Sequence, residues 1–594
     1  MQRTAPEHAP PSLLRKIAVP LLIVIGIQLW MLLGSIYWGR NYQLLVLAAA
    51  VGIGVIPPVA RRVGGWLDRI RHPSPRSRFI AAAAIFVAST AFIVIVAIAQ
   101  GRALILKYHD EHSYMIQIRM LAKGRLWMPP HPIGDFFESF SLLTEPVYTS
   151  IYFPGTALLY VPALWLGLPM WLAAAMIAGG CAAMFYRVLA ELVDGVAAAA
   201  GALMLLSVSV FRMVSVMLLA QGPMLLIALL TWWAWLRWRD SRRWHWAAAM
   251  GLFGGWSAII RPLDAVILVG PVALAALVDL WPMQWRQRLT TAAAALAAAA
   301  PLLAMQLAMN LAVTGKPLET PFEEYARRYY PQTTLGFHTF DPTARPLSQL
   351  PQKHAYYDEA AVPFIKAHQW DTIVGEWLRT YLPLTFASAT PQRLMMILLP
   401  VGLLGLIDRR RVAMGLGLPL FVGLYFFYTF FLPHYTLIVL PSMILLIVLA
   451  IAVMERTYPR QRRIVASAGY LAMAALCISE WPGINRLMRD DVFYPHAVLQ
   501  VRESLAAIDP PAVVLFRYAS GESGHDEPVY NIDVAWPDDA PIIRAHDLGE
   551  RNVEIFRYYA QRDPDRVFYL YDRADHSLMR LGSATELALP TPAR

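Results

Sequence analysis

Charged residues are scarce in this chain. Of its 594 residues only 15% are Asp, Glu, Lys or Arg, whereas 57% are hydrophobic, and the mean hydropathy is +0.45. A soluble globular protein carries nearer 25% charge, so the composition excludes an ordinary soluble protein. Several apolar runs reach the roughly 18–20 residues that cross a hydrocarbon core. Such long runs do not suit barrel strands, and we predict a polytopic α-helical membrane protein.

Cysteine is almost absent as well. Cys181 and Cys477 both fall within apolar runs, which excludes a disulfide framework and a cysteine-based metal site. Lys and Arg exceed Asp and Glu, giving a net charge of +10. The basic residues cluster in short loops between apolar runs, where they mark the cytoplasmic side and face anionic membrane lipids. We interpret the charge as topological and predict no nucleic acid partner.

Hydropathy predicts about 13–14 apolar segments. They are residues 18–38, 43–60, 79–99, 155–168, 171–187, 196–211, 217–236, 245–260, 263–281, 290–312, 394–407, 412–432, 435–454 and 464–480. Four crossings between residues 155 and 236 would put a basic loop on the outer side, against the charge rule. Segment 155–168 is therefore expected to be re-entrant or to cross only half of the membrane.

The segments divide the chain into three predicted regions. Residues 1–78 form an N-terminal membrane hairpin with a basic cytoplasmic loop, and residues 79–484 form a transmembrane domain with outer loops 100–152 and 313–391. Residues 485–594 have the composition of a small soluble α/β domain. This tail has strands predicted at 512–516 and 566–571 and a helix at 552–561. By the span count, both loops and the tail lie on the extracytoplasmic side.

An acidic pair, Asp110 and Glu111, opens the first outer loop. Ionisable groups beside a bilayer tend to mark functional sites, although a solvated acidic turn is the alternative. Residues 113–124 carry apolar side chains at every third position, which predicts an amphipathic helix on the membrane surface, capped by Ser113. The later acidic residues of this loop are expected to be solvated. They are Asp135, Glu138 and Glu145.

The acidic pair supplies the candidate catalytic residues. Sugar transfer from a phosphate-linked donor needs a base that takes the proton of the acceptor hydroxyl, and Asp110 or Glu111 can serve. A divalent metal such as Mg or Mn could neutralise the departing phosphate. His109 and His112 flank the pair, but no His-x-x-x-His spacing is present. Metal binding therefore stays open, and Asp110 is a candidate ligand.

Basic side chains supply candidates for binding the donor phosphate. Arg261 lies at a proline turn between two segments, and its planar fork suits phosphate. The alternative is a helix-end anchor or a partner for Asp264. Further candidates, each of which could equally be a solvated loop residue, lie in or near the second outer loop. They are Lys316, Arg327, Arg328, His354 and His434.

Several short motifs resemble one enzyme superfamily. Residues 110–119 (DEHSYMIQIR) are followed by 124–126 (GRL), 129–130 (PP) and 152–155 (YFPG). This series resembles the GT-C superfamily of integral-membrane glycosyltransferases, in particular its protein-mannosyltransferase-like and aminoarabinose-transferase-like bacterial branches. Residues 255–264 and 314–318 also look like the corresponding stretches of uncharacterised members of this superfamily. The likeness covers most of residues 79–455, with Phe153 replacing a proline of the usual motif.

The resemblance implies an inverting transferase of hexosyl or pentosyl groups. The donor would be a polyprenyl-phosphate-linked sugar, and the acceptor an envelope lipid, glycan or protein at the outer face of the bacterial inner membrane. Asp110 would be the base or a metal-associated carboxylate, with Glu111 second. Two alternatives stay open: a lipid or glycan transporter or flippase, and a non-catalytic subunit for envelope-glycan assembly. No internal repeat or mid-span charge pattern supports a transporter.

Overall fold

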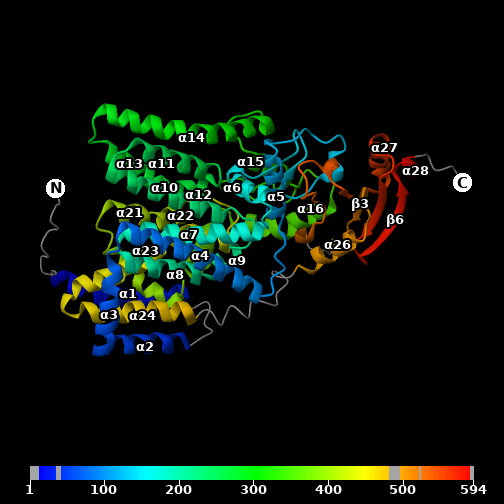
Figure 1. Ribbon diagram of the computed structural model, residues 1–594. Helices are drawn as coiled ribbons and strands as arrows, with labels where there is room; N and C mark the ends of the chain where they lie inside the picture. The colour runs from blue at the N-terminus through cyan, green and yellow to red at the C-terminus, as the bar shows by residue number, and fades with distance from the viewer. Residues whose placement is uncertain (1–12, 35–41, 480–494, 521–523, 589–594) are drawn as a thin grey trace.

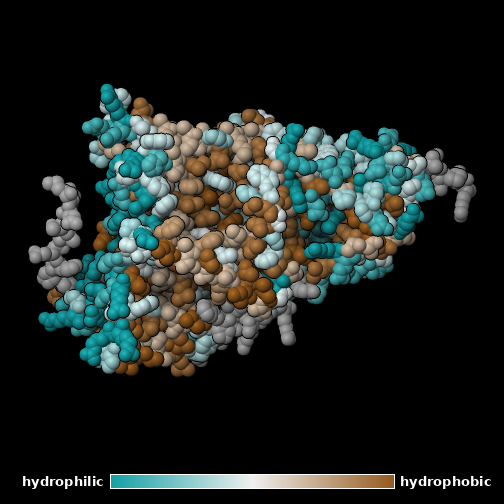
Figure 2. Space-filling view, in the orientation of Figure 1, coloured by the Kyte–Doolittle hydropathy of each residue, from teal (hydrophilic) through white to brown (hydrophobic). Residues whose placement is uncertain are grey.

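The structure is a computed structural model that describes residues 13–34, 42–479, 495–520 and 524–588. A bundle of helices forms one end of the molecule, and a small sheet with its helices forms the other (Figure 1). Hydrophobic residues cover the bundle as a broad band between two polar ends (Figure 2). This distribution is expected of a bundle that spans a membrane. The predicted polytopic helical membrane protein is confirmed.

Six helices are long and apolar enough to cross a membrane, and two bent pairs raise the number to at most eight among the described residues. The six are α1 (Leu13–Gly34), α4 (Pro75–Ala99), α7 (Met170–Leu192), α14 (Trp285–Thr314), α23 (Leu440–Thr457, preceded by the 3-10 helix η6, Pro433–Val439) and α24 (Arg462–Ser479). The bent pairs are α2 (Tyr42–Val55) with α3 (Pro57–Arg71), at 88°, and α12 (Pro262–Leu268) with α13 (Gly270–Leu280), at 49°.

The predicted count of segments was too high for full crossings. Helix α6 (Pro154–Trp165) has 12 residues, which reach about 18 Å, whereas the hydrocarbon core is about 30 Å thick. Hydropathy detects how apolar a run of residues is, but not whether the run forms one helix that is long enough to cross the membrane. Turns divide several of the predicted apolar runs into shorter helices. The remaining helices of the bundle are α8 (Gly195–Ser207), α9 (Ser209–Val214), α10 (Gln221–Ser241), α11 (Trp244–Ala258), η5 (Arg393–Leu398), α20 (Leu399–Leu403), α21 (Arg409–Gly415) and α22 (Gly417–Tyr425).

The N-terminal hairpin differs from its prediction. Segment 43–60 is not one straight helix, because α2 ends at Val55 and Pro57 starts α3 in a new direction. Proline cannot continue the hydrogen-bonding of a preceding helix but suits a first helical position. Arg71, at the end of α3, is buried and pairs with Asp194 at 2.6 Å and Glu455 at 2.9 Å. The end predicted for the first segment, at residue 38, lies outside the described residues.

Helix α5 (His109–Ala122) of the first outer loop is not a surface helix, contrary to the prediction. Ten of its 14 residues are buried. Its polar face is accommodated by internal partners: Gln117 donates to the carbonyl of Tyr152 at 2.7 Å, and Ser113 donates to the carbonyl of Ser141 at 2.6 Å. Ser113 therefore does not cap the helix. Around α5 lie η2 (Gly134–Phe137) and the antiparallel pair β1 (Leu142–Leu143) and β2 (Thr149–Ser150).

The second outer loop is largely helical and packs between the bundle and the C-terminal sheet (Figure 1). Its elements are α15 (Pro321–Tyr329), α16 (Pro351–Tyr356), η3 (Tyr357–Ala361), α17 (Val362–Ala367), α18 (Ile373–Glu376), η4 (Trp377–Tyr381) and α19 (Leu382–Ala389). Gly524, near the sheet, approaches the ring of Tyr356 so closely that an added Cβ would lie 2.6 Å from it. The loop and the tail are thus in contact.

The C-terminal region folds as a four-stranded mixed sheet in the order β4-β3-β5-β6. Strands β3 (Ala512–Arg517), β4 (Ile542–His546) and β5 (Val567–Asp572) are parallel, and β6 (Ser577–Ser583) is antiparallel to β5. The helices are α26 (His496–Ala506), α27 (Asn552–Arg562) and α28 (Ala584–Ala588). Phe136 and Phe137 of the first outer loop are part of the core of this sheet. The predicted boundary at residue 485 lies outside the described residues.

Candidate active site

Glu111 fastens the first turn of α5. Its Oε2 accepts the backbone N–H groups of Lys107, at 3.0 Å, and Tyr108, at 3.2 Å, while Oε1 accepts that of Leu218 at 3.0 Å. The side chain is buried, which raises the pKa of Glu111, and the three N–H donors oppose that rise. Both oxygens are thus engaged by the backbone. This arrangement favours a structural role for Glu111, which is to position α5, over a catalytic role.

Asp110 occupies a different environment from its neighbour. It is half-buried, and Oδ1 accepts a hydrogen bond from the Tyr152 hydroxyl at 2.5 Å. The ring of Tyr152 stacks on that of Tyr114, with centroids 4.5 Å apart. Burial raises the pKa of Tyr152, and the charge of Asp110 raises it further, so the phenol stays protonated and donates. Asp110 therefore points to the aromatic motif that starts α6, whereas Glu111 points back to its own helix.

Asp110 lines a cavity of about 330 Å³ that five parts of the chain enclose. They are the stretch from the end of α4 into α5, the segment from α9 onward, α16, the start of η6 and Pro495. The walls combine ten apolar residues with eight polar or ionisable ones. The apolar lining includes Leu104, Ile105, Val214, Met217 and Leu219, and the polar lining includes Arg102, Lys107, Asp110, Tyr356 and His434.

Arg102 introduces a positive charge at the cavity. Its guanidinium donates to the carbonyl of Met213 at 2.8 Å and to Gln100 at 2.7 Å. Burial, and then repulsion by Arg212, lower the pKa of Arg102 to about 10. An anion in the cavity would relieve this repulsion between like charges. Sequence inspection missed Arg102 and Lys107, since basic residues just after an apolar run look like ordinary boundary residues.

Arg261 is held by a buried carboxylate. Its Nε lies 2.5 Å from Oδ2 of Asp264, its Nη2 donates to the Tyr425 hydroxyl at 3.2 Å, and its guanidinium lies 4.7 Å from the ring centroid of Tyr435. Asp264 is fully buried and also accepts from Tyr425 at 2.7 Å. The structure thus contains the partnership with Asp264 that was the alternative for this residue. Arg261 is not among the side chains that line the 330 Å³ cavity.

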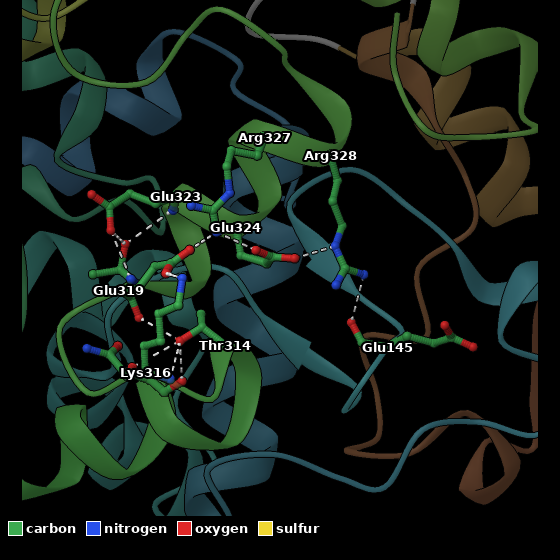
Figure 3. Close-up of polar contacts among 10 residues, drawn as sticks. Glu145, Thr314, Lys316, Glu319, Glu323, Glu324, Arg327 and Arg328 are labelled. Carbon is green, nitrogen blue, oxygen red and sulfur yellow. Dashed lines mark hydrogen bonds and ion pairs between the residues drawn. The ribbon is translucent and has the colours of Figure 1, made fainter.

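The basic residues proposed in the second loop lie away from Asp110. Figure 3 shows Lys316, Arg327 and Arg328 turned toward carboxylates of their own loop. Lys316 lies 2.8 Å from Glu319, Arg328 lies 2.5 Å from Glu324, and Arg327 pairs with both glutamates. All three stand outside the cavity lining. Their assignment to the donor phosphate stays a prediction that the geometry does not favour.

The histidines divide into two groups. Nδ1 of His109 lies 2.9 Å from the Tyr530 hydroxyl, and the ring of His112 stacks on Tyr530 with centroids 4.5 Å apart. These contacts join α5 to the C-terminal region. His354 bonds the carbonyl of Ser348 at 2.9 Å, while His434 lines the cavity with Asp110. Within the described part of the chain, no three His, Cys, Asp or Glu side chains are grouped so that they could hold a metal ion.

Glu138 is buried, so the expectation of a solvated residue was wrong. Its Oε1 lies 2.9 Å from Nζ of Lys353 on α16, and that oxygen also accepts from Ser348 at 2.6 Å. The ammonium lies 3.6 Å from the ring centroid of Tyr329. A buried carboxylate requires such partners. This pair ties the two outer loops together beside the site, and nothing in the spacing of the sequence indicates it.

A second cavity, of about 650 Å³, lies between the bundle and the C-terminal region. It shares four wall residues with the first cavity: Leu104, Ile105, Glu111 and Val216. The C-terminal region contributes Arg502 and Arg544, and the bundle contributes apolar residues such as Met170 and Trp171. The residues around Glu111 therefore line both cavities, and each cavity combines apolar, basic and acidic side chains.

Comparisons with known proteins identify the fold. No family model matches the sequence, and no curated protein matches it. Among solved structures, apo ArnT from Cupriavidus metallidurans aligns with a TM-score of 0.50 at 13% identity, over 86% of this chain and 100% of that one. ArnT bound to undecaprenyl phosphate aligns at 0.47, with 13% identity, over 86% and 99%. The oligosaccharyltransferase of Archaeoglobus fulgidus aligns at 0.36, with 11% identity, over 80% and 65%.

The alignment with apo ArnT covers 86% of this chain, and it shows a fold shared with that GT-C glycosyltransferase. The GT-C-like fold suggested by the sequence motifs is therefore confirmed. At 13% identity the likeness concerns the fold alone.

Proposed function

We propose that this protein is a membrane glycosyltransferase that moves a sugar from a polyprenyl-phosphate donor to an envelope acceptor. The single observation that carries the proposal is the position of Asp110, a carboxylate at the edge of a cavity that combines apolar lining residues with the basic side chains of Arg102 and Lys107. An apolar chain with a phosphate head needs both features. ArnT, whose fold this chain shares, has been crystallised with undecaprenyl phosphate.

The donor is expected to place its phosphate near Arg102 and its first isoprene units along the apolar wall. Repulsion between Arg102 and Arg212 favours an anion there. Lys107, one helical turn before Glu111, adds a second positive charge to the same cavity. Charge-assisted hydrogen bonds of this kind are about twice as strong as neutral ones. The sugar would then lie between the phosphate and Asp110.

The reaction uses Asp110 as a general base. An acceptor hydroxyl oxygen attacks the anomeric carbon and forms the new glycosidic bond, while the bond between that carbon and the phosphate oxygen breaks. The phosphate leaves with the electron pair, and the hydroxyl proton passes to the Asp110 carboxylate. Attack from the face opposite the phosphate inverts the anomeric centre. Tyr152 holds the carboxylate in place through its 2.5 Å hydrogen bond.

A divalent metal such as Mg or Mn is not built into this scheme. The described residues offer no group of three metal-binding side chains, so the charge of the leaving phosphate is assigned to Arg102 and Lys107. The acceptor is expected to reach Asp110 from the 650 Å³ cavity, past Glu111, which lines both cavities. We place the protein in the bacterial inner membrane with both cavities and the C-terminal region on its outer side.

The test is transfer by the purified protein. The full chain would be assayed in detergent or nanodiscs with a panel of polyprenyl-phosphate sugars, and release of polyprenyl phosphate would be followed by mass spectrometry. Asp110→Asn should bind the donor but lose about 10²–10⁴ in rate, the contribution typical of general-base assistance. Asp135→Asn, on an exposed part of the same loop, is the matched control. Turnover by Asp110→Asn close to that of the control would refute the proposal.

A further inference from the structure

A cavity of about 500 Å³ opens at the end of the bundle opposite to the C-terminal sheet, where α10 turns into α11 and where α14 begins (Figure 1). Its lining contains three arginines, one histidine and no carboxylate. The lining residues are Arg242, Arg243, Trp244, His245, Arg286, Gln287, Thr290 and Thr291. Figure 2 shows a hydrophilic patch at this end, bordering the hydrophobic band.

The three arginines are not neutralised by acidic residues. Within residues 13–34, 42–479, 495–520 and 524–588, no Asp or Glu forms an ion pair with Arg242, Arg243 or Arg286. The nearest acidic residues are already engaged, because Asp240 lies 3.0 Å from Arg237 and Asp279 lies 3.3 Å from Arg239. The cavity therefore holds an excess of positive charge.

Contacts of the arginines keep them beside the cavity. Arg242 stands over the ring of Trp238, 4.7 Å from its centroid, and one of its nitrogens donates to the carbonyl of Asp279 at 3.4 Å. Arg286 stands 5.6 Å from the ring centroid of Trp285. A guanidinium has five N–H donors, so each keeps most of its capacity to bind an anion bidentately.

The helices at the cavity add to this potential. Helices α11 and α14 pack side by side and begin at the same end (Figure 1). Neither has a side-chain cap, and neither has an acidic residue in its first turn. Their unpaired N–H groups thus increase the positive field that the arginines create.

The residues near the cavity are of the kinds found at the level of lipid head groups. Trp244 lines the cavity and is exposed, and Trp281 and Trp285, which precede Arg286 in the sequence, are exposed as well; tryptophan prefers the level of lipid head groups. Beyond the cavity, α14 is apolar and exposes the side chains of Leu289 and Leu296. A ligand here would have its charge among the arginines and its apolar part against α14.

We propose that this cavity binds the phosphate of an anionic membrane phospholipid, with the acyl chains along α14. The site is separate from the catalytic cavity and does not depend on the glycosyltransferase function. Basic side chains near an anionic lipid surface each strengthen binding roughly fivefold. Replacing all three arginines should therefore weaken binding by a factor of about 100.

The experiment compares two triple variants of the full chain in detergent. Arg242→Gln/Arg243→Gln/Arg286→Gln alters the cavity, and Arg61→Gln/Arg62→Gln/Arg69→Gln removes the same charge from exposed positions of α3. Binding of dioctanoyl phosphatidylglycerol, dioctanoyl phosphatidylcholine and inorganic phosphate would be measured by native mass spectrometry. The wild type and the α3 variant should prefer phosphatidylglycerol, and the cavity variant should lose this preference.

Three results would overturn the proposal: equal losses in both variants, no preference for phosphatidylglycerol in the wild type, or inorganic phosphate binding as tightly as the lipid. If the triple cavity variant does not fold, Arg243→Gln alone is tested. It should weaken lipid binding about fivefold. Unchanged binding would count against the proposal.

Discussion

The Tyr152 hydroxyl lies 2.5 Å from Oδ1 of Asp110. This hydrogen bond joins the acidic motif at the start of α5 to the aromatic motif at the start of α6. Both motifs were recognised in the sequence, but only the structure brings them together. Because the phenol stays protonated, the bond fixes the orientation of the carboxylate at the cavity edge.

Replacing Tyr152 by Phe should lower kcat while the protein stays folded. Hydrogen bonds to charged groups contribute about 1.5–3 kcal/mol, and Asp110 is only half-buried, so we expect a loss of about tenfold. Tyr148→Phe is the matched control, because Tyr148 is on the same loop and packs against Trp536. Steady-state kinetics would give kcat for both variants. Equal kcat values for Tyr152→Phe and Tyr148→Phe would show that the hydrogen bond from Tyr152 does not orient Asp110.

Glu111→Gln should affect stability more than chemistry. The carboxylate accepts three backbone N–H groups in a buried site, and an amide would direct its own NH₂ at one of these donors. The expected cost is about 2–3 kcal/mol of unfolding free energy. Thermal unfolding should show a lower Tm, with turnover per folded molecule reduced less than in Asp110→Asn. An unchanged Tm with lost turnover would instead make Glu111 catalytic.

Donor binding should depend on the cavity's basic residues and not on the pairs in Figure 3. Arg102→Gln/Lys107→Gln should weaken donor affinity, because each charged contact to a phosphate contributes about 1.5–3 kcal/mol. Lys316→Gln/Arg327→Gln removes the same charge from residues that already pair with Glu319. Titration of a polyprenyl phosphate into both variants tests this. If Lys316→Gln/Arg327→Gln lost more donor affinity than Arg102→Gln/Lys107→Gln, the phosphate site would be assigned to the second outer loop instead.

The two outer loops and the C-terminal sheet should share one side of the membrane. Cysteines at Arg125, Thr343 and Ala574, all exposed, should react with an impermeant thiol reagent in spheroplasts, whereas one at Arg61 should not. The native Cys181 and Cys477 are buried and should not react with the reagent. Labelling of the Arg61 position, or protection of one of the other three, would overturn the proposed orientation.

Features with a local cause could be predicted from the sequence. The apolar run 79–99 became α4, and the short apolar runs at 512–516 and 566–571 became β3 and β5. Strand β4 (Ile542–His546) was missed because it is short and two of its five residues are Arg544 and His546. It is a strand because it pairs in parallel with β3.

Features that depend on distant partners could not be predicted. Glu111 and Asp110 are adjacent in sequence, yet their roles diverge because the backbone of Leu218 meets one and Tyr152 meets the other. Both acidic residues line the 330 Å³ cavity, and so does Arg102. The sequence did not indicate Arg102, because its proximity to Arg212 depends on the fold. No periodicity encodes such contacts between segments.

The contact between α5 and the C-terminal region should weaken in acid. His112 is buried against Tyr530, and burial, together with the charge of Arg544, lowers the pKa of His112 to about 3 from an ordinary value of 6.5. Between these two values the unfolded chain binds a proton that the folded chain does not. Stability attributable to His112 is therefore present above pH 6.5 and is lost as the pH falls toward 3.

Between pH 7 and pH 5 this single group should cost about 2 kcal/mol of unfolding free energy. Tm measured across this range should fall less steeply in His112→Gln than in the wild type, because glutamine does not titrate. His576→Gln, on an exposed turn of the sheet, is the matched control and should keep the wild-type slope. Parallel slopes in wild type and His112→Gln would mean that His112 is charged in the folded protein, and that its stack on Tyr530 accommodates a cation beside Arg544.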